Sequence, residues 1–203
     1  MKIAIIDYGM GNIFSIQNAI KYIGYDSVYT DDFGIIRSAD KIILPGVGSF
    51  RKAMENILNK EIDKLLQEVV CERKTSLLGI CLGMQLLAKS STEDRFTEGL
   101  GFIDAKIDLI NKYDNLKIPH VGFDEVNFCK DSLLFNGIEN ASDFYFTHSY
   151  KMTSANNHCN GTCNYGEEFI VSFEKENIYG TQFHPEKSQN NGLILLKNFI
   201  EKL

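Results

Sequence analysis

A cysteine between two glycines joins an apolar run to a helical pattern at residues 75–89, and this junction restricts the folds open to the chain. The run Thr75–Ile80 (TSLLGI) is short and apolar, as in a buried strand, and the helical pattern Leu82–Lys89 follows with almost no loop. A strand that passes directly into a helix needs a sharp turn, and Gly79 and Gly83 leave room for the backbone there. The junction therefore predicts an α/β fold with Cys81 on a strand-to-helix turn.

The same alternation of strand and helix fills the first ~90 residues and indicates a parallel sheet covered on both faces. From Gly101 to about Ser172 short strands and turns predict antiparallel additions, and a hairpin is expected at Glu176-Asn177. We expect one domain, residues 1–203, with a mostly parallel mixed sheet flanked by helices. The other predicted strands are Lys2–Asp7, Ser27–Thr30 and Lys41–Leu44, and the other predicted helices run from the N-cap Asn12 to Gly24, from Phe50 to Glu72 and from Asn191 to Lys202.

Composition narrows the classes of partner. The chain has 203 residues, a net charge of −6 and no basic face, which argues against nucleic acid. No apolar stretch approaches ~20 residues and the N-terminus reads as a buried strand, so we expect no membrane span and a cytoplasmic location. The odd number of cysteines, five, favours free thiols. Cys159 and Cys163, near His158, are spaced too loosely for a metal site, so an ordinary turn is favoured and no metal or cofactor is predicted.

Cys81 is the candidate nucleophile. The turn would place its sulfur at a helix N-terminus, where the partial positive charge favours the thiolate, and the N–H of Leu82 would point at an adjacent oxyanion. A lone cysteine is more often a small buried apolar residue. The two flanking glycines and the strand-to-helix context favour the nucleophile instead.

Two other segments supply partners for a reactive thiol. His184 and Glu186 follow a strand two residues apart, so in an extended segment they share a side, and the carboxylate could orient the imidazole as a general base. Pro185 between them stiffens the backbone. The loop Pro45–Gly48 contains two glycines that let backbone N–H groups approach an oxyanion closely. A surface turn is the alternative at each segment.

Five segments in order along the chain resemble one known family: IIDYGMGN, LPGVGSF, GICLGMQLL, FYFTHSY and GTQFHPEKSQ. Together they resemble the class I glutamine amidotransferases, and more narrowly the glutaminase subunits of imidazole glycerol phosphate synthase. The resemblance implies that Cys81 attacks the side-chain amide of L-glutamine, that His184 moves the proton and that Glu186 orients His184. It also implies an oxyanion hole formed by Val47, Gly48 and Leu82, and a substrate pocket formed by Gln85, Glu93, His148, Ser149 and Tyr150.

The resemblance further implies a partner, a (β/α)8-barrel synthase subunit that receives the ammonia through a channel. That heterodimer would make imidazole glycerol phosphate and an aminoimidazole carboxamide ribonucleotide in histidine biosynthesis. The residues implied to face the partner are His120, Phe123, Asp124 and Lys187.

One position departs from the pattern of the histidine-pathway members, which usually carry a tryptophan followed by asparagine after the Pro-His-x-Gly segment. Here Phe123 and Asp124 stand in that place, and the chain has no tryptophan. Either the change is a tolerated aromatic swap, or the chain is a paralogue that supplies ammonia for amidation of a surface-polysaccharide sugar. A cysteine peptidase or stress protein with a similar elbow is a more distant alternative, because such proteins are not expected to carry GMQLL, THSY and HPEKS together.

Overall fold

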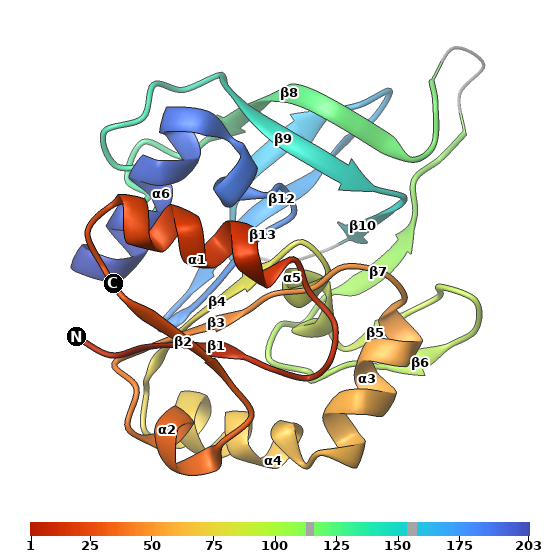
Figure 1. The fold of residues 1–203 in the computed structure, drawn as a ribbon. Helices are drawn as coiled ribbons and strands as arrows, with labels where there is room; N and C mark the ends of the chain where they lie inside the picture. The colour runs from red at the N-terminus through yellow and green to blue at the C-terminus, as the bar shows by residue number, and fades with distance from the viewer. Residues whose placement is uncertain (113–115, 154–157) are drawn as a thin grey trace.

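The computed structural model describes residues 1–112, 116–153 and 158–203, and a 13-stranded mixed sheet runs through these parts of the chain (Figure 1). The main path of the sheet has the order β2-β1-β3-β4-β13-β12-β10-β7-β5-β6, and β11, β8 and β9 branch from β12. The strands are β1 (Ile3–Ile6), β2 (Ser27–Thr30), β3 (Lys41–Leu44), β4 (Ser76–Ile80), β5 (Ser90–Ser91), β6 (Thr97–Glu98), β7 (Lys106–Leu109), β8 (His120–Phe128), β9 (Ser142–His148), β10 (Tyr150–Thr153), β11 (Cys159–Asn164), β12 (Glu168–Lys175) and β13 (Ile178–Thr181).

Helices cover both faces of the parallel half of the sheet, which is formed by β2, β1, β3, β4 and β13 (Figure 1). Helices α1 and α6 lie side by side on one face, whereas α2, α3 and α4 lie on the other. The helices are α1 (Ile13–Tyr22), α2 (Phe33–Arg37), α3 (Phe50–Asn59), α4 (Ile62–Leu66), α5 (Leu82–Leu86) and α6 (Gln189–Lys202), with a π-helical turn at Gln67–Glu72 and a 3-10 turn at Pro185–Lys187.

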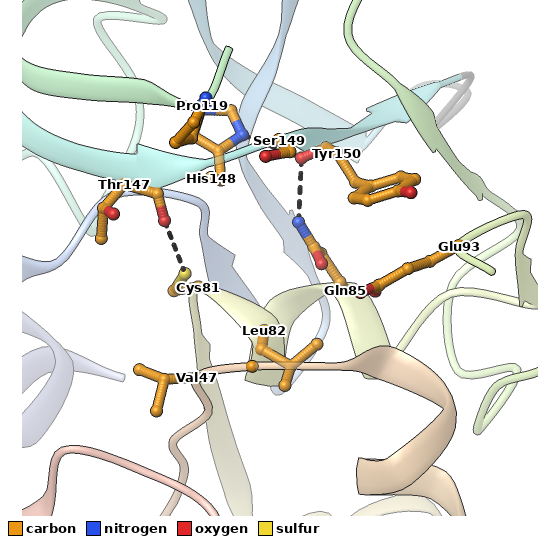
Figure 2. Close-up of a pocket in the computed structure, with 11 residues that line it drawn as sticks. Val47, Cys81, Leu82, Gln85, Glu93, Pro119, Thr147, His148, Ser149 and Tyr150 are labelled. Atoms are coloured by element: carbon orange, nitrogen blue, oxygen red, sulfur yellow. Dashed lines mark hydrogen bonds between the residues drawn. The ribbon is translucent and has the colours of Figure 1, made fainter.

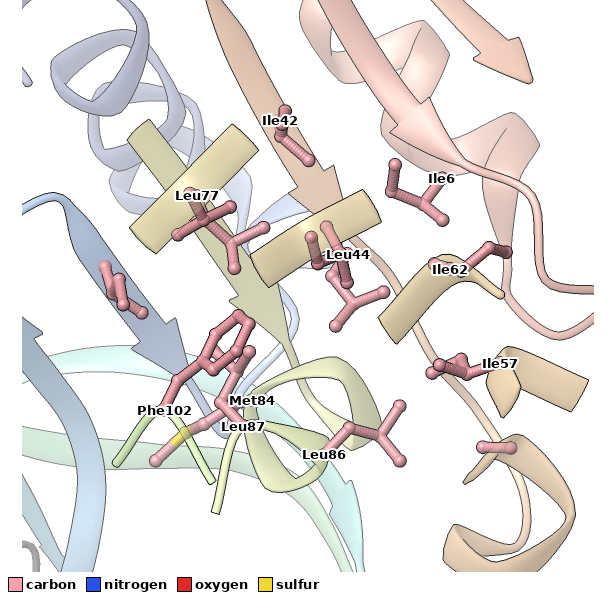
Figure 3. Packing of buried hydrophobic residues seen from close by; sticks show 14 of the residues in the cluster. Ile6, Ile42, Leu44, Ile57, Ile62, Leu77, Met84, Leu86, Leu87 and Phe102 are labelled. Carbon is pink, nitrogen blue, oxygen red and sulfur yellow. The ribbon is translucent and has the colours of Figure 1, made fainter. Parts of the chain in front are cut away.

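Alternation along each parallel strand divides the core between the two faces. In β1, Ile3 and Ile5 pack with α1 and α6, whereas Ile6 packs with the helices of the opposite face. Figure 3 shows the cluster on the face covered by α2, α3 and α4, in which Ile6 and Leu44 from the sheet meet side chains of the covering helices. Because both faces are buried, the four residues of β1 read as a continuous apolar run.

The antiparallel strands bring the end of the chain back to the elbow. A hairpin at Glu176-Asn177 joins β12 to β13, as predicted, and β13 then pairs in parallel with β4, so that Thr181 lies opposite Ile80. The residues that follow these two strands, including Cys81 and His184, therefore emerge at the same edge of the sheet. The predicted fold class, a mostly parallel mixed sheet flanked by helices with antiparallel additions, is confirmed.

Several predicted boundaries are wrong. The single helix expected from Phe50 to Glu72 is broken after Asn59, because Glu61 has a left-handed backbone with φ 55°, and its last part is π-helical. The helix after Cys81 ends at Leu86 and not at residue 89, and α2 was not predicted. Cys159 and Cys163 lie on strand β11 and not in a turn. The described residues contain no helix long and apolar enough to cross a membrane.

Candidate active site

The elbow holds Cys81 in a backbone conformation that side chains rarely adopt. Its φ is 53° and its ψ is −111°, and its N–H donates a 2.7 Å hydrogen bond to the carbonyl of Thr181 on β13. A Cβ on Gly83 would lie 1.8 Å from the carbonyl oxygen of Leu44, and one on Gly79 would lie 2.8 Å from that of Gly83. Both glycines are therefore needed for the close packing that keeps the strained cysteine in place.

The Cys81 sulfur lies at the floor of an open cavity, within reach of two polar groups. The thiol donates to the Thr147 carbonyl at 3.9 Å (Figure 2). The Gln182 amide donates to the sulfur at 3.7 Å. Leu82 begins helix α5, so its N–H has no partner within the helix and is available to a ligand. The predicted nucleophile thus has a hydrogen-bond donor to its sulfur and a free backbone donor beside it.

His184 and Glu186 form a buried pair next to the thiol. Nδ1 of His184 and Oε1 of Glu186 are 2.8 Å apart, and the two side chains are 2% and 1% exposed. Burial disfavours the imidazolium, but the Cys81 thiolate and the Glu186 carboxylate outweigh it and raise the pKa of His184 to about 10. Nε2 of His184 has no hydrogen-bond partner by geometry among the described residues, and the Cys81 thiol lies near enough to act on the imidazole.

A network around Ser188 fixes the position of His184. The hydroxyl of Ser188 donates to the His184 carbonyl at 2.6 Å and accepts from the N–H of Tyr145 at 2.9 Å. The N–H of His184 donates to the Tyr145 carbonyl at 2.9 Å. The expectation that residues 184–186 are extended is only half right: His184 is extended, but Glu186 lies in the 3-10 turn that begins at Pro185, and this turn still directs its carboxylate at the imidazole.

The glycine loop after β3 lies beside the elbow. A Cβ on Gly46 would be 2.5 Å from the hydroxyl of Tyr8 and 2.8 Å from the backbone nitrogen of Gly83, and Gly48 has a φ of +97°. The buried Tyr8 hydroxyl donates to the Pro45 carbonyl at 2.6 Å. Burial, with a smaller effect of the charge on Cys81, raises the pKa of Tyr8, so it remains a donor. The loop is therefore tied to the sheet next to the thiol.

The thiol opens into a cavity of about 380 Å³. Gln85 is 5% exposed, and its amide donates to the Tyr150 carbonyl at 2.9 Å and to Oε1 of Gln182 at 2.8 Å. Glu93 accepts the N–H of Phe50, the first residue of α3, at 2.9 Å through Oε2. The cavity thus brings together the predicted nucleophile, oxyanion loop and substrate residues; its lining is Val47, Gly48, Cys81, Leu82, Gln85, Glu93, Pro119, Thr147, His148, Ser149 and Tyr150 (Figure 2).

The four residues predicted to face a partner lie apart from the cavity and differ in exposure. Phe123 is 48% exposed, whereas His120 is 1% exposed and cannot itself present a surface. The Asp124 side chain is 35% exposed and lies 3.1 Å from His120. The ammonium group of Lys187 lies over the ring of Tyr145, 5.4 Å from its centroid.

Besides Pro119, which lines the cavity, three residues that hydrogen-bond within or beside the site were missed by sequence reasoning. Gln182 contacts both Gln85 and Cys81. The carbonyl of Thr147 accepts a hydrogen bond from the Cys81 thiol, and the hydroxyl of Tyr8 donates one to Pro45 in the glycine loop. All three lie inside the five segments that resemble the family, so their position in those segments was the available signal. In the described residues, no group of three or more His, Cys, Asp or Glu side chains is arranged to hold a metal ion.

Comparison with known proteins agrees with this geometry. A family model described as glutamine amidotransferase class-I matches residues 4–203. The chain is 45% identical over 202 residues to imidazole glycerol phosphate synthase subunit HisH 2 of Vibrio vulnificus, covering 99% of this chain and 94% of the relative. It is 48% identical over 202 residues to subunit HisH 1 of Methanococcus maripaludis, covering 98% of each chain.

Solved structures share the fold at low sequence identity. A crystal structure of a glutamine amidotransferase superposes with a TM-score of 0.77 at 16% identity, covering 98% of this chain and 97% of the other. A glutamine amidotransferase from Thermotoga maritima superposes with a TM-score of 0.65 at 17% identity, covering 99% of this chain and 81% of the other. These likenesses show the fold alone.

Proposed function

Because the chain belongs to the class I glutamine amidotransferases, and within them to the family of the HisH subunits of imidazole glycerol phosphate synthase, we propose that it hydrolyses L-glutamine at Cys81 and passes the ammonia to a synthase subunit. The observation that carries this proposal is the meeting of three segments distant in sequence. The strained Cys81 and the glycine loop at Gly48 line one cavity, and the buried pair of His184 and Glu186 lies close enough to Cys81 for the thiolate to raise the pKa of His184.

In the first half of the proposed reaction, Cys81 attacks the side-chain amide carbon of glutamine. His184 takes the thiol proton and gives it to the leaving nitrogen, so that the C–N bond breaks and ammonia departs. Glu186 holds Nδ1 of His184, which leaves Nε2 to face the sulfur, and it stabilises the imidazolium. The product of this half is a glutamyl thioester on Cys81.

In the second half, water attacks the thioester carbonyl. His184 removes a proton from the water, the C–S bond breaks, His184 returns the proton to the Cys81 sulfur, and glutamate leaves. The negative oxygen that forms in each half needs fixed donors in a site with little water. We assign this role to the N–H groups of Leu82, at the start of α5, and of Val47 and Gly48 in the glycine loop.

The polar end of glutamine is assigned to the other end of the cavity. We propose that Gln85 and Glu93 hold the α-carboxylate and α-amino groups, together with the backbone of His148, Ser149 and Tyr150. The chemistry of the lining supports the part of this assignment that concerns the α-amino group. The Glu93 carboxylate suits an ammonium group, and because both N–H groups of Gln85 donate to Tyr150 and Gln182, its Oε1 remains as a second acceptor.

The proposed partner is a (β/α)8-barrel synthase subunit that consumes the ammonia to make imidazole glycerol phosphate and aminoimidazole carboxamide ribonucleotide in histidine biosynthesis, in the cytoplasm. Transfer inside a complex has a chemical reason, because free ammonia at pH 7 is mostly protonated and no longer nucleophilic. A second candidate acceptor, a surface-polysaccharide sugar, is favoured by one observation: Phe123 and Asp124 replace the usual tryptophan and asparagine on the exposed strand β8.

A two-substrate assay tests the proposal. The chain is mixed with a histidine-pathway synthase subunit, and glutamate release and synthase turnover are measured with glutamine or with ammonium salt as nitrogen source. We expect the synthase subunit to raise glutamate release sharply. Stimulation only by a barrel subunit from a sugar-amidation pathway would reject the histidine pathway, and no glutamate release with either subunit would reject the glutaminase.

A further inference from the structure

A chain of hydrogen bonds runs from the exposed strand β8 to the wall of the glutamine cavity. Oδ2 of Asp124 lies 3.1 Å from Nε2 of His120, and Nδ1 of His120 lies 3.0 Å from Nε2 of His148. Nδ1 of His148 then lies 2.8 Å from the carbonyl oxygen of Tyr150, which also accepts the Gln85 amide. The two histidines are paired across β8 and β9, so the backbone register holds them together.

The protons in this chain of hydrogen bonds can be assigned one by one, starting from its buried end at His148. A carbonyl oxygen only accepts, so Nδ1 of His148 carries a proton and donates to Tyr150. Burial lowers the pKa of His148 to about 3, which leaves it neutral with a lone pair on Nε2. Nδ1 of His120 must therefore be protonated to make the contact between the two histidines.

The contact between His120 and Asp124, at the exposed end of the hydrogen-bond chain, then lacks a donor. A neutral imidazole has one N–H, and His120 uses it toward His148. Its Nε2 would face the Asp124 carboxylate as a second acceptor, and two acceptors at 3.1 Å repel each other. The observed contact therefore requires one additional proton between His120 and Asp124.

We propose that Asp124 keeps its contact with His120 only while the two side chains share this additional proton, and that the carboxylate, once released, turns outward into water. The release occurs at the outer contact for a physical reason. The Asp124 side chain is 35% exposed and gains water when it leaves, whereas His148 is buried and its Nε2 would be left without a donor.

The surroundings of His120 favour the released state at neutral pH. Its ring stacks between Phe146 and Tyr165, with centroids 4.7 and 4.0 Å away. Burial lowers the pKa of His120, and the Asp124 carboxylate only partly reverses this effect. The other titratable groups near the chain are Cys163 on β11, whose thiol senses the charges of Asp124 and Glu125, and His184, whose charge acts on His148.

The proton count is tested by NMR on the isolated protein, with the imidazole nitrogens of its histidines labelled with ¹⁵N. As pH rises, we expect Nε2 of His120 to lose its proton while Nδ1 keeps it. In Asp124→Asn the amide donates to the neutral Nε2 and the negative charge is gone, so this titration moves at least about one pH unit lower. The matched control Glu125→Gln, one residue along the strand, leaves it in place. Loss of the proton from Nδ1, or an equal shift in the control, overturns the proposal.

Discussion

Nδ1 of His184 lies 2.8 Å from Oε1 of Glu186, and both side chains are nearly completely shielded from solvent. A carboxylate buried in this way has lost its hydration, and it is stabilised chiefly by the imidazole that it contacts. The pair therefore favours a proton on His184 and leaves Nε2 directed at the thiol.

Glu186→Gln is expected to lower the kcat of glutamine hydrolysis by about 10²-fold or more, because a glutamine cannot stabilise the imidazolium that forms when the thiol is deprotonated. Glu98→Gln on the exposed strand β6 is the matched control and should leave kcat unchanged. Steady-state glutamate release measures both variants. Equal kcat values for Glu186→Gln and the wild type would contradict the assigned role.

The same pair makes stability depend on pH. The folded chain raises the pKa of His184 from 6.5 to about 10, so its contribution to the free energy of unfolding is fully present below pH ~6.5. Above that pH the unfolded chain loses the proton first, and the contribution declines until it is gone above about 10. Urea unfolding at pH 6, 8 and 10 should show a smaller decline in Glu186→Gln than in the wild type, since the variant lacks the carboxylate. Identical declines would argue against a raised pKa.

Glu93 is expected to act on both substrate binding and the oxyanion loop. Its carboxylate lines the cavity and accepts the N–H of Phe50, which directly follows the loop and its capping residue Ser49. Glu93→Gln keeps an acceptor for Phe50 but removes the charge, so KM for glutamine should rise about tenfold with little change in kcat. Glu93→Ala removes both and should also lower kcat. Asp94→Asn, which alters only a surface ion pair with Arg51, is the control.

Gly83→Ala tests the packing of the elbow. The new methyl group would lie 1.8 Å from the Leu44 carbonyl, so we expect a loss of about 3 kcal/mol or more in the free energy of unfolding, together with loss of activity. Gly101→Ala is the comparison for backbone strain alone, because Gly101 has a positive φ, +70°, but no atom within 4 Å of a new Cβ. That variant should lose only about 1 kcal/mol. Equal losses in the two variants would contradict the claim that close approach to Leu44 requires glycine at position 83.

Sequence reasoning succeeded where the signal is local. The apolar run before Cys81, the helical spacing after it and the glycines at 79 and 83 are readable without a structure, and they place Cys81 correctly on a strand-to-helix turn. The helix break near Glu61 had no such signal, because neither glycine nor proline marks it. The single-domain interpretation stays a prediction.

Long-range relationships were accessible only in three dimensions. The parallel pairing of β13 with β4, which brings His184 to Cys81 across about half of the chain, depends on the register of the whole sheet. The sequence likewise suggested that His120 faces a partner, but its ring is buried and contacts His148 instead. Spacing along one strand cannot reveal which side chain of a neighbouring strand lies opposite.

The central claim is a covalent glutamyl intermediate on Cys81, and the most direct test is mass spectrometry of the chain quenched in acid during turnover of glutamine with the synthase subunit. We predict a glutamyl adduct on the peptide that contains Cys81, absent from Cys81→Ala, which should release no glutamate while the complex still uses ammonia. A glutamyl adduct on a different residue, or glutamate release by Cys81→Ala at the wild-type rate, would contradict the account.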